Sequence, residues 1–546
     1  MSRKRTGADI VIEALIAEGV DTVFGYPGGQ VLDIYDALER NRSRIKHILT
    51  AHEQGAAHAA DGWARATGKV GVVIATSGPG ASNLVTGIAT AYLDSSPLVA
   101  ITGNVDTTQI GRDSFQELDI ADITMPITKH NYIVKDVNKL GSILREAFSI
   151  ARSGRKGPVL VDIPRDIQAA KCELPLPEAI PCAAESTSPE LLEALSKAAG
   201  IISAAQRPLI YCGGGAVSAG AGSLITVLSD KIDAPIGCSL MGLSAIPESP
   251  SKLGLTGMHG RQYATKAVCE ADVIIAVGAR FTDRATGSRG EYVSRAKIVQ
   301  LDIDPAEVDK NVRDAAYVIG ELKTTLKLLI DALPAAEHPE WRSLTAPPPK
   351  TAQTGFSPFA VIDSVASKTA GWLVATDVGQ HQMWVAQEYP INSERSFITS
   401  GGLGTMGFGM GAAIGASLSE NRRPVVLFTG DGSFGMDLIE LATAVTYKIP
   451  LMVIIMNNSS LGMVKQLQKL NFRRTSQSEL SRATDFVKLA EAFGARGFRA
   501  STPDELNSAL ESALVLINKK TPTPCVIECL IDKDERVSLY TSGGNQ

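Results

Sequence analysis

Short runs of apolar residues alternate with helix-like patterns from one end of the chain to the other. Runs such as VGVVIA (70–75), DVIIAV (272–277) and PVVLFTG (424–430) are nearly continuous in aliphatic residues, and each leads through glycine into a helical pattern. Continuous runs of this kind are typical of parallel strands that are buried on both faces of a sheet and joined by helices. The pattern therefore predicts an α/β fold built from open parallel sheets.

Two stretches interrupt this alternation. Residues 171–190 are rich in proline, serine and acidic groups, and residues 333–358 contain three consecutive prolines and few periodic apolar positions. Both are typical of linkers. A chain of 546 residues is also too long for a single core. We therefore expect three domains, at residues 1–170, 191–332 and 359–546.

Charge and composition narrow the class of protein. The 53 basic and 58 acidic side chains give a net charge of −5, which does not favour a nucleic-acid partner. The N-terminal segment has no apolar signal core, and no apolar run approaches the ~20 residues of a membrane span. Seven cysteines, an odd number without zinc-site spacing, indicate reduced and mostly buried thiols. These features predict a cytoplasmic protein with no membrane contact.

A carboxylate and an amide end two successive apolar runs in the last third of the chain. Asp431 lies between two glycines after PVVLFT, and Asn458 follows PLMVIIMN. Because neighbouring strand ends meet at one edge of a parallel sheet, we expect these side chains to lie close together. Mg²⁺ prefers oxygen ligands and is commonly shared between protein carboxylates and phosphates. We therefore predict a Mg²⁺ site formed by Asp431, Asn458 and the backbone carbonyl of Ser460, beside a diphosphate at the helix start.

Local structure alone offers a simpler explanation for each of these residues. Asp431 could cap a helix, and Asn457 with Asn458 could form a turn. The pair at this spacing, with Ser433 completing GDGS, favours the metal site. A GxGxxG pattern at Gly402–Gly407 is weak evidence for a dinucleotide site because it follows no clear apolar strand. We interpret it as a loop that contacts a cofactor.

Glu53 stands near the start of HEQGAAHAADGWARATGK (52–69), a segment rich in Ala and Gly that predicts a helix with few charged groups. A carboxylate in such surroundings must be paired, hydrogen-bonded or protonated. Pairing with Arg65 or with a backbone group is the structural explanation. A role in catalysis is the functional one.

GDGS followed by NN resembles the diphosphate and metal signature of thiamine-diphosphate enzymes, and nearly the whole chain is similar to the catalytic large subunits of acetohydroxyacid synthase (acetolactate synthase). The motifs that carry the similarity include VFGYPGG (23–29), the segment 52–69, TSGPGASNLVTGIATAY (76–92), GPVLVDIPRDIQ (157–168), LGLTGMHG (253–260), TDVGQHQMWVAQ (376–387), TSGGLGTMGFG (399–409) and LGMV (461–464). The resemblance implies a pyrimidine-binding, a central FAD-binding and a diphosphate-binding domain.

Roles for individual residues follow from the resemblance. It implies that Glu53 hydrogen-bonds the aminopyrimidine of the coenzyme, that Met406 holds its bent shape, and that Gln116 and Gln30 lie near the reacting carbon. It implies that Arg284 meets the carboxylate of the acceptor substrate. Contacts with thiamine diphosphate are implied for Gly29, Pro79, Asn83, Val378, Gly379, Gln380, His381, Gly404, Gly432, Ser433, Gly462 and Met463. Contacts with FAD are implied for Arg155, Gly214, Met258, His259, Arg280 and Asp302.

The implied enzyme decarboxylates pyruvate and transfers the hydroxyethyl unit to a second 2-oxo acid, giving 2-acetolactate or 2-aceto-2-hydroxybutyrate. In such enzymes each active site lies between two subunits, so the resemblance implies a homodimer or homotetramer, and a regulatory small subunit is possible. FAD is structural there and takes no part in redox chemistry. A flavin oxidoreductase with a vestigial thiamine module is a further alternative, against which Glu53 and the metal residues argue.

Three departures from the family pattern lie where the acceptor should bind. Gln30 stands where alanine is usual, Asp106 where proline is usual, and Leu467 where tryptophan is usual. Elsewhere, Ala51 replaces an arginine and Thr282 an aspartate. The first three motivate an alternative, a related thiamine-diphosphate-dependent lyase or ligase with a different acceptor. Loss of a tryptophan contact can change acceptor choice by about tenfold or more.

Overall fold

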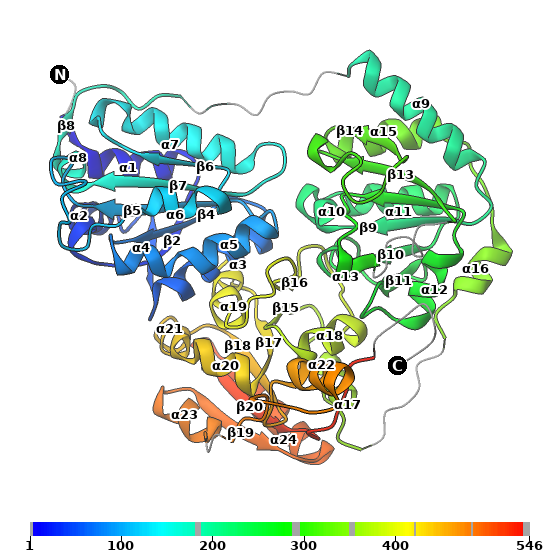
Figure 1. Ribbon diagram of the computed structural model, residues 1–546. Coiled ribbons are helices and arrows are strands. Elements are labelled where there is room, and N and C mark those ends of the chain that lie inside the picture. The colour runs from blue at the N-terminus through cyan, green and yellow to red at the C-terminus, as the bar shows by residue number, and fades with distance from the viewer. Residues whose placement is uncertain are drawn as a thin grey trace.

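The computed structural model describes residues 4–178, 180, 187–286, 295–348, 355–419, 422–481 and 484–538. Three lobes surround a common centre, and each is built on a six-stranded parallel sheet flanked by helices (Figure 1). The predicted α/β fold of open parallel sheets is therefore confirmed. The strands of the three sheets lie within residues 22–164, 208–319 and 373–530.

The N-terminal sheet has the strand order β3-β2-β4-β5-β7-β6. Its central strands are aliphatic and wholly buried, as expected for a sheet covered on both faces. The strands are β2 (Thr22–Tyr26), β3 (Lys46–Leu49), β4 (Gly71–Ala75), β5 (Leu98–Asn104), β6 (His130–Ile133) and β7 (Pro158–Pro164). The helices are α1 (Gly7–Ala17), α2 (Leu32–Arg40), α3 (Glu53–Thr67), α4 (Pro79–Asn83), α5 (Val85–Leu93), α6 (Ile120–Thr124), α7 (Val137–Arg152) and α8 (Arg165–Ala169).

The central sheet has the strand order β11-β10-β9-β12-β13-β14. Its strands are β9 (Pro208–Cys212), β10 (Ile236–Cys238), β11 (Lys252–Leu255), β12 (Val273–Val277), β13 (Lys297–Asp302) and β14 (Ala316–Ile319). Its helices are α9 (Pro189–Ser203), α10 (Gly214–Ala219), α11 (Gly222–Lys231), α12 (Gln262–Glu270), α13 (Asp283–Thr286), α15 (Leu322–Ala332) and α16 (Pro339–Thr345). Helix α16 lies inside the segment 333–358 that the sequence suggested as a linker, because Trp341 is buried there and donates a hydrogen bond to Pro208 O.

The C-terminal sheet has the strand order β16-β15-β17-β18-β20-β19. Its strands are β15 (Leu373–Thr376), β16 (Phe397–Ile398), β17 (Val425–Gly430), β18 (Leu451–Asn457), β19 (Arg496–Ala500) and β20 (Cys525–Leu530). Its helices are α17 (Pro358–Lys368), α18 (Gln380–Glu388), α19 (Gly409–Ser417), α20 (Asp431–Asp437), α21 (Leu441–Thr446), α22 (Gly462–Phe472), α23 (Phe486–Ala492) and α24 (Pro503–Ile517). Strands β17 and β18 are direct neighbours, with Gly430 opposite Met456. This register brings the loops that follow them to the same edge of the sheet.

Helix α3 of the N-terminal domain packs against α19 of the C-terminal domain at the centre of the molecule (Figure 1). Arg65, near the end of α3, strengthens this junction. It pairs with Asp61 at 2.8 Å and Asp94 at 2.9 Å, and donates to the backbone oxygen of Thr399 at 2.8 Å. The helix that carries Glu53 is therefore anchored to both domains.

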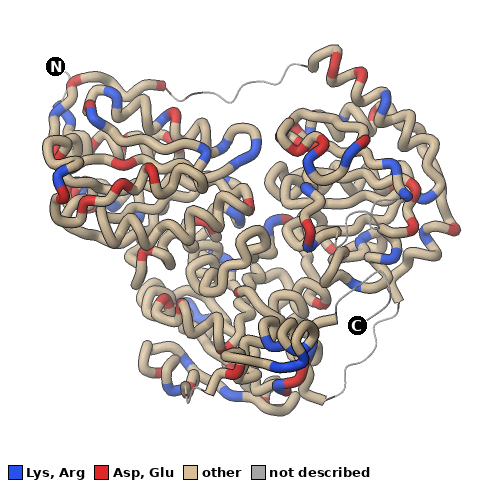
Figure 2. Tube along the Cα trace, in the orientation of Figure 1, with Lys and Arg blue, Asp and Glu red and all other residues tan. Residues whose placement is uncertain are grey.

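Charged side chains of both signs are spread over all three domains (Figure 2). Six cysteines among the described residues are free thiols, and Cys182 lies outside the described part of the chain. Every helix in the described part of the chain is too short or too polar to cross a bilayer.

Candidate active site

Glu53 is the first residue of α3 and lies beside α4. Its carboxylate accepts a hydrogen bond from Asn83 Nδ2 at 3.0 Å. Pro79 is the first residue of α4. The alternative in which Glu53 pairs with Arg65 is not realised, because that guanidinium binds two other carboxylates. Glu53, Pro79 and Asn83 therefore form one cluster at the carboxyl end of the N-terminal sheet.

Gly29, Gln30 and Gln116 extend this cluster. Gly29 and Gln30 lie in the short helix η1 (Gly29–Val31), where Gln30 N donates to Thr76 Oγ1 at 3.1 Å. Gln116 adopts a left-handed backbone with φ of 60°, and it lies against Gly78, directly before Pro79. The Gln30 Oε1 atom is buried and has no hydrogen-bond partner among the described residues. The N-terminal residues predicted to surround the reacting carbon thus share one edge of the sheet.

A second group of predicted residues lines a cavity at the carboxyl end of the C-terminal sheet. Asn458 Oδ1 accepts from Ser460 N at 3.2 Å, and Asn458 Nδ2 donates to Gln380 Oε1 at 3.1 Å. Ser433 Oγ donates to the backbone oxygen of Val378 at 2.8 Å. These bonds connect the loops after β15, β17 and β18. The cavity is lined by Val378, Gly379, Gln380, His381, Met406, Asp431, Gly432, Ser433, Asn458, Ser460, Gly462, Met463 and neighbouring residues.

The lining of this cavity fits a diphosphate. A Cβ at Gly462 would lie 1.8 Å from Gln380 Oε1, so only glycine allows the two loops to approach this closely. Burial lowers the pKa of His381 to about 3, so its imidazole is neutral near pH 7. The Nε2 atom of His381 is buried without a partner among the described residues. A buried polar atom in this state needs a ligand or water, and a diphosphate oxygen would satisfy it.

The donor set at the cavity suits a hard cation. Among the described residues, no group of three or more His, Cys, Asp or Glu could hold a metal ion. A transition-metal centre of that kind is thus absent from this part of the chain. Asp431 begins α20, and Asn458 and Ser460 follow the neighbouring strand. One carboxylate with amide and carbonyl oxygens is a set that Mg²⁺ can use when phosphate and water complete its shell.

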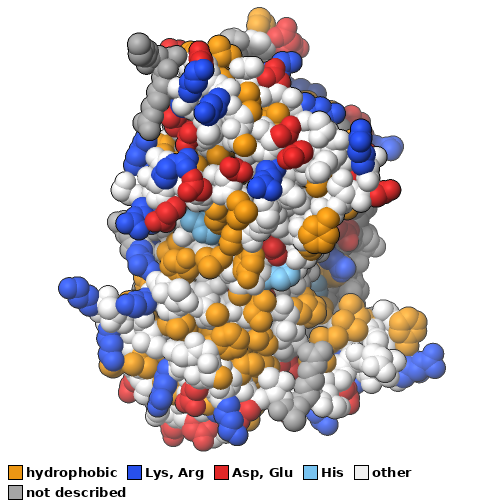
Figure 3. All heavy atoms as spheres, turned by 90° about the vertical axis from the view of Figure 1, so that its left-hand side faces the viewer, with side chains coloured by type: hydrophobic (Ala, Val, Ile, Leu, Met, Phe, Trp, Pro, Cys, Tyr) orange, Lys and Arg blue, Asp and Glu red, His pale blue; other side chains and the backbone are white. Residues whose placement is uncertain are grey.

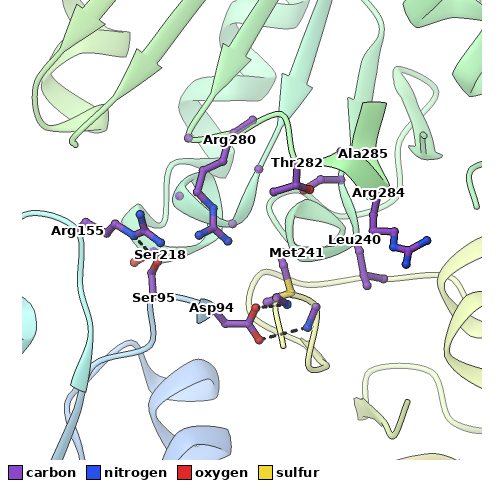
Figure 4. Close-up of a pocket in the computed structure, with 18 of the residues that line it drawn as sticks. Asp94, Ser95, Arg155, Ser218, Leu240, Met241, Arg280, Thr282, Arg284 and Ala285 are labelled. Carbon is purple, nitrogen blue, oxygen red and sulfur yellow. Dashed lines mark hydrogen bonds between the residues drawn. The ribbon is translucent and has the colours of Figure 1, made fainter. Parts of the chain in front are cut away.

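A larger cavity of about 1340 Å³ lies where the three domains meet. In Figure 4, Arg155 from the N-terminal domain and Arg280 from the central domain point into the same space. Arg155 donates to Ser95 Oγ at 2.9 Å, and Arg280 donates to the backbone oxygen of Leu93 at 2.9 Å. Two guanidinium groups beside a glycine-rich turn suit an anionic ligand such as a nucleotide diphosphate.

Most residues predicted to contact FAD line this larger cavity: Arg155, Gly214, His259, Arg280 and Asp302. Met258 is not part of the lining, but its sulfur lies 3.5 Å from Arg284 Nη1. Arg284 and Gly404 also line the cavity. The two cavities adjoin, because both are lined by Val378, Gly379, Met406, Met463 and Val464.

Comparison with known proteins decides the family. Three family models match the chain: the N-terminal TPP binding domain of thiamine pyrophosphate enzymes at residues 5–123, their central domain at 195–329, and their C-terminal TPP binding domain at 377–529. The probable acetolactate synthase large subunit of Methanocaldococcus jannaschii is 44% identical, over 98% of this chain and 94% of its own. The acetolactate synthase large subunit of Parasynechococcus marenigrum is 44% identical, over 97% and 88%. Isozyme 3 from Escherichia coli is 43% identical, over 93% and 92%.

The chain belongs to the acetolactate synthase large-subunit family of thiamine pyrophosphate enzymes. The predicted family is therefore confirmed, and the alternative of a related lyase or ligase with another acceptor is not favoured. The role of each site residue stays a prediction.

One residue that shapes the C-terminal cavity was missed in the sequence. Asp377 Oδ1 accepts from Val378 N at 2.8 Å and from Gly407 N at 3.0 Å, and Oδ2 accepts from Gly409 N at 3.3 Å. The buried carboxylate thereby fixes the loop that carries Met406 against the loop after β15. Burial raises the pKa of Asp377 to about 6, while the backbone N–H groups lower it. An acid directly after an apolar run was the available signal.

The departures from the acetolactate synthase pattern lie at different places. Leu467 is on helix α22 and is 37% exposed. Asp106 follows β5 and is partly buried, while Gln30 lies near Glu53 in the N-terminal cluster. The three positions are therefore contributed by two domains.

Proposed function

We propose that this protein is the catalytic large subunit of a thiamine-diphosphate-dependent acetolactate synthase that joins pyruvate to a second 2-oxo acid. The observation that carries the proposal is the C-terminal cavity. There Asp431, Asn458 and Ser460 stand at adjacent strand ends beside glycines that let the loops approach closely. Thiamine diphosphate would supply the nucleophilic carbon that attacks the keto group and stabilises the charge left after loss of carbon dioxide.

The side chains of this chain have distinct tasks in that reaction. Asp431, Asn458 and Ser460 would hold Mg²⁺, whose charge would offset that of a bound diphosphate. His381 would donate a hydrogen bond to the diphosphate as a neutral imidazole. Glu53, held by Asn83, would share a proton with a ring nitrogen of the aminopyrimidine, because a proton on that nitrogen favours the reactive imino tautomer.

A homodimer would bring the two clusters together. The described residues that line the C-terminal cavity all belong to the C-terminal domain, and we propose that Glu53 reaches this cavity from a second chain. Figure 3 shows hydrophobic side chains gathered where the N-terminal domain meets the C-terminal domain on one face. The exposed large hydrophobic residues of the elements in this region include Tyr26, Leu32, Leu49, Met436 and Ile439. An apolar surface of this kind suits a second copy of the chain, whose Glu53 would complete the site.

The larger cavity supports FAD as a second cofactor. Its lining combines the glycine-rich turn after β9 with Arg155 and Arg280, and its volume is sufficient for a dinucleotide.

We expect the purified protein to release FAD on denaturation, and Arg280→Ala to lower flavin content by about tenfold because a cation facing the diphosphate is lost. Flavin fluorescence after heat release measures this. A matched change at exposed Arg42, far from the cavity, should leave the flavin content unchanged; an equal loss in both variants would contradict the assignment.

Because tryptophan is usual at this position in the family, Leu467 predicts a change in acceptor preference, although it lines neither described cavity. Leu467→Trp should alter the ratio of 2-aceto-2-hydroxybutyrate to 2-acetolactate by about tenfold, because an added indole supplies an aromatic wall to the acceptor site. Product ratios at equal pyruvate and 2-oxobutanoate measure the effect. Leu470→Trp, on the same helix and also exposed, is the control. Equal ratios in wild type and Leu467→Trp would remove this residue from the acceptor site.

A small partner and a cellular location complete the proposal. The relatives are named large subunits, which supports a regulatory small subunit as a partner. The cytoplasmic location stays a prediction.

Incubation of the pure protein with pyruvate alone tests the proposed activity. With Mg²⁺ and thiamine diphosphate present, we expect carbon dioxide and 2-acetolactate in equal amounts, identified by mass spectrometry. Carbon dioxide without acetolactate, and ligation only after another acceptor is added, would favour the lyase or ligase. Oxygen uptake with pyruvate would favour the flavin oxidoreductase.

A further inference from the structure

A buried acid of the C-terminal domain holds the start of the helix that carries Glu53. Glu440 ends the short helix η6 (Leu438–Glu440), a few residues after Asp431. Its Oε1 accepts from Ala51 N at 3.1 Å and from His52 N at 2.9 Å, and its Oε2 also lies 3.1 Å from Ala51 N. These two N–H groups immediately precede Glu53. The carboxylate thus binds the backbone at the point where α3 begins.

The surrounding contacts are arranged around this carboxylate. A Cβ at Gly55 would lie 2.1 Å from Glu440 Oε1, so a side chain there would push Glu440 away from α3. Thr443 Oγ1 donates to Glu440 Oε2 at 2.6 Å and orients it. Tyr447 Oη accepts from Leu49 N at 2.8 Å and provides a second link between the same two segments. The segment before Glu53 is therefore held by the C-terminal domain as well as by strand β2, whose Gly25 O accepts from Thr50 N at 3.3 Å.

Glu440 has no access to a substrate. Its side chain is fully buried, and it lines none of the cavities described above. Asp437, itself buried, interacts electrostatically with Glu440, and His52 lowers the pKa of Glu440. Burial raises the pKa of Glu440, and the N–H groups of Ala51 and His52 lower it. A carboxylate is costly to bury unless donors surround it, so these bonds account for its presence.

We propose that Glu440 is a positioning residue for Glu53. It fixes the start of α3 so that the Glu53 carboxylate lies within hydrogen-bonding distance of the aminopyrimidine. The inference rests on the proposed function of Glu53. Glu440 follows the helix that begins with Asp431, so the domain that holds the metal in one site also sets the acid that serves the other site of the dimer. Displacement of a catalytic group by about 1 Å can lower a rate by about 100-fold.

The test uses Glu440→Gln, which keeps the volume of the side chain but replaces one acceptor oxygen by a donor. Without coenzyme, we expect the backbone amides of residues 49–56 to exchange hydrogen about tenfold faster or more, because two N–H groups lose an acceptor. With coenzyme bound, we expect exchange of the thiazolium C2 proton to slow by about 10- to 100-fold. The affinity for thiamine diphosphate should stay within about threefold, because the metal site is untouched.

A double variant separates positioning from general damage. If Glu440 acts through Glu53, the change Glu440→Gln should cause no further slowing of C2 exchange in a Glu53→Gln background. Asp272→Asn is the matched control: its carboxylate accepts from the backbone N–H groups of Gln206 and Arg207 at 2.8 Å, in the central domain. That variant should leave C2 exchange unchanged. If Glu440→Gln does not fold, Glu440→Asp retains the charge but withdraws it by one methylene, and the same slowing is expected.

The possible outcomes are distinct. Unchanged C2 exchange in Glu440→Gln, or equal slowing in the presence and absence of Glu53, would overturn the positioning role. A wild-type protein that binds no thiamine diphosphate would overturn the proposed function and this inference with it. Slowed C2 exchange that depends on Glu53, with coenzyme affinity retained, would establish it.

Discussion

Glu53→Gln is expected to lower turnover by about 100-fold or more while thiamine diphosphate stays bound. Glutamine keeps the shape of the side chain and its contact with Asn83. Its amide cannot exchange a proton with the ring, so the aminopyrimidine loses the partner that stabilises its reactive tautomer. Steady-state formation of acetolactate measures the first effect, and calorimetric titration with the coenzyme measures the second.

The control for this variant is Glu39→Gln. Glu39 lies in the same domain and pairs with Arg42 at 2.9 Å on the exposed surface, where an ion pair contributes little. Its activity should match the wild type. Near-normal turnover in Glu53→Gln would refute the assigned role, and simultaneous loss of coenzyme binding would indicate a structural role instead.

Asp431→Asn is expected to weaken binding of thiamine diphosphate by about 100-fold at millimolar Mg²⁺. The amide keeps the geometry at the start of α20 but removes the one carboxylate of the predicted metal site. The variant then binds Mg²⁺ less well, and the negative charge of the diphosphate is no longer compensated in the cavity. Titration with coenzyme across a range of Mg²⁺ concentrations measures the loss, and Asp504→Asn, in the first turn of α24, is the control. Equal affinity in Asp431→Asn and wild type would contradict the metal site.

Mixing Glu53→Gln with Asp431→Asn, at a coenzyme concentration too low to load Asp431→Asn, tests whether the active sites are shared between chains. In a mixed dimer, one of the two sites receives an unaltered Glu53 from one chain and an unaltered Asp431 from the other chain. The second site receives both altered residues. Random reassociation would make half of the dimers mixed, each with one intact site, so activity should recover to about a quarter of wild type. If both residues acted within one chain, mixing would restore nothing.

The sequence predicted those features that depend on local pattern. Continuous aliphatic runs identified the buried parallel strands, because such strands contact helices on both faces. The placement of Asp431 and Asn458 at adjacent strand ends followed from the same logic, and the pairing of β17 with β18 has the register it requires. Glu53 was singled out by its place in a helix poor in charge, and the structure puts it beside Asn83.

The sequence did not reveal contacts made between distant segments. Asp377 follows an apolar run and Glu440 has no distinctive neighbours along the chain, but the backbone N–H groups that each accepts from are brought to it only by folding. Asp94 likewise accepts from Gly401 and Gly402, more than 300 residues away in the chain. Composition and periodicity describe which residues are buried. They do not predict which buried carboxylate accepts hydrogen bonds from the backbone of which distant turn.

Helix α16, within residues 333–358, was also not predicted from the sequence. Three prolines and few periodic apolar positions suggested a linker, yet a single large side chain is enough to fix a short helix when its indole ring is buried and its N–H is bonded. Trp341 provides both contacts. One residue is too weak a periodic signal to be recognised in the sequence.

The most direct test of the account is a calorimetric titration of the purified protein with thiamine diphosphate, once with Mg²⁺ and once with a chelator. We expect saturable binding of one coenzyme per chain in the presence of Mg²⁺, and a loss of about 100-fold in affinity when the cation is removed. Absence of binding with Mg²⁺ present, or equal affinity under both conditions, would contradict it.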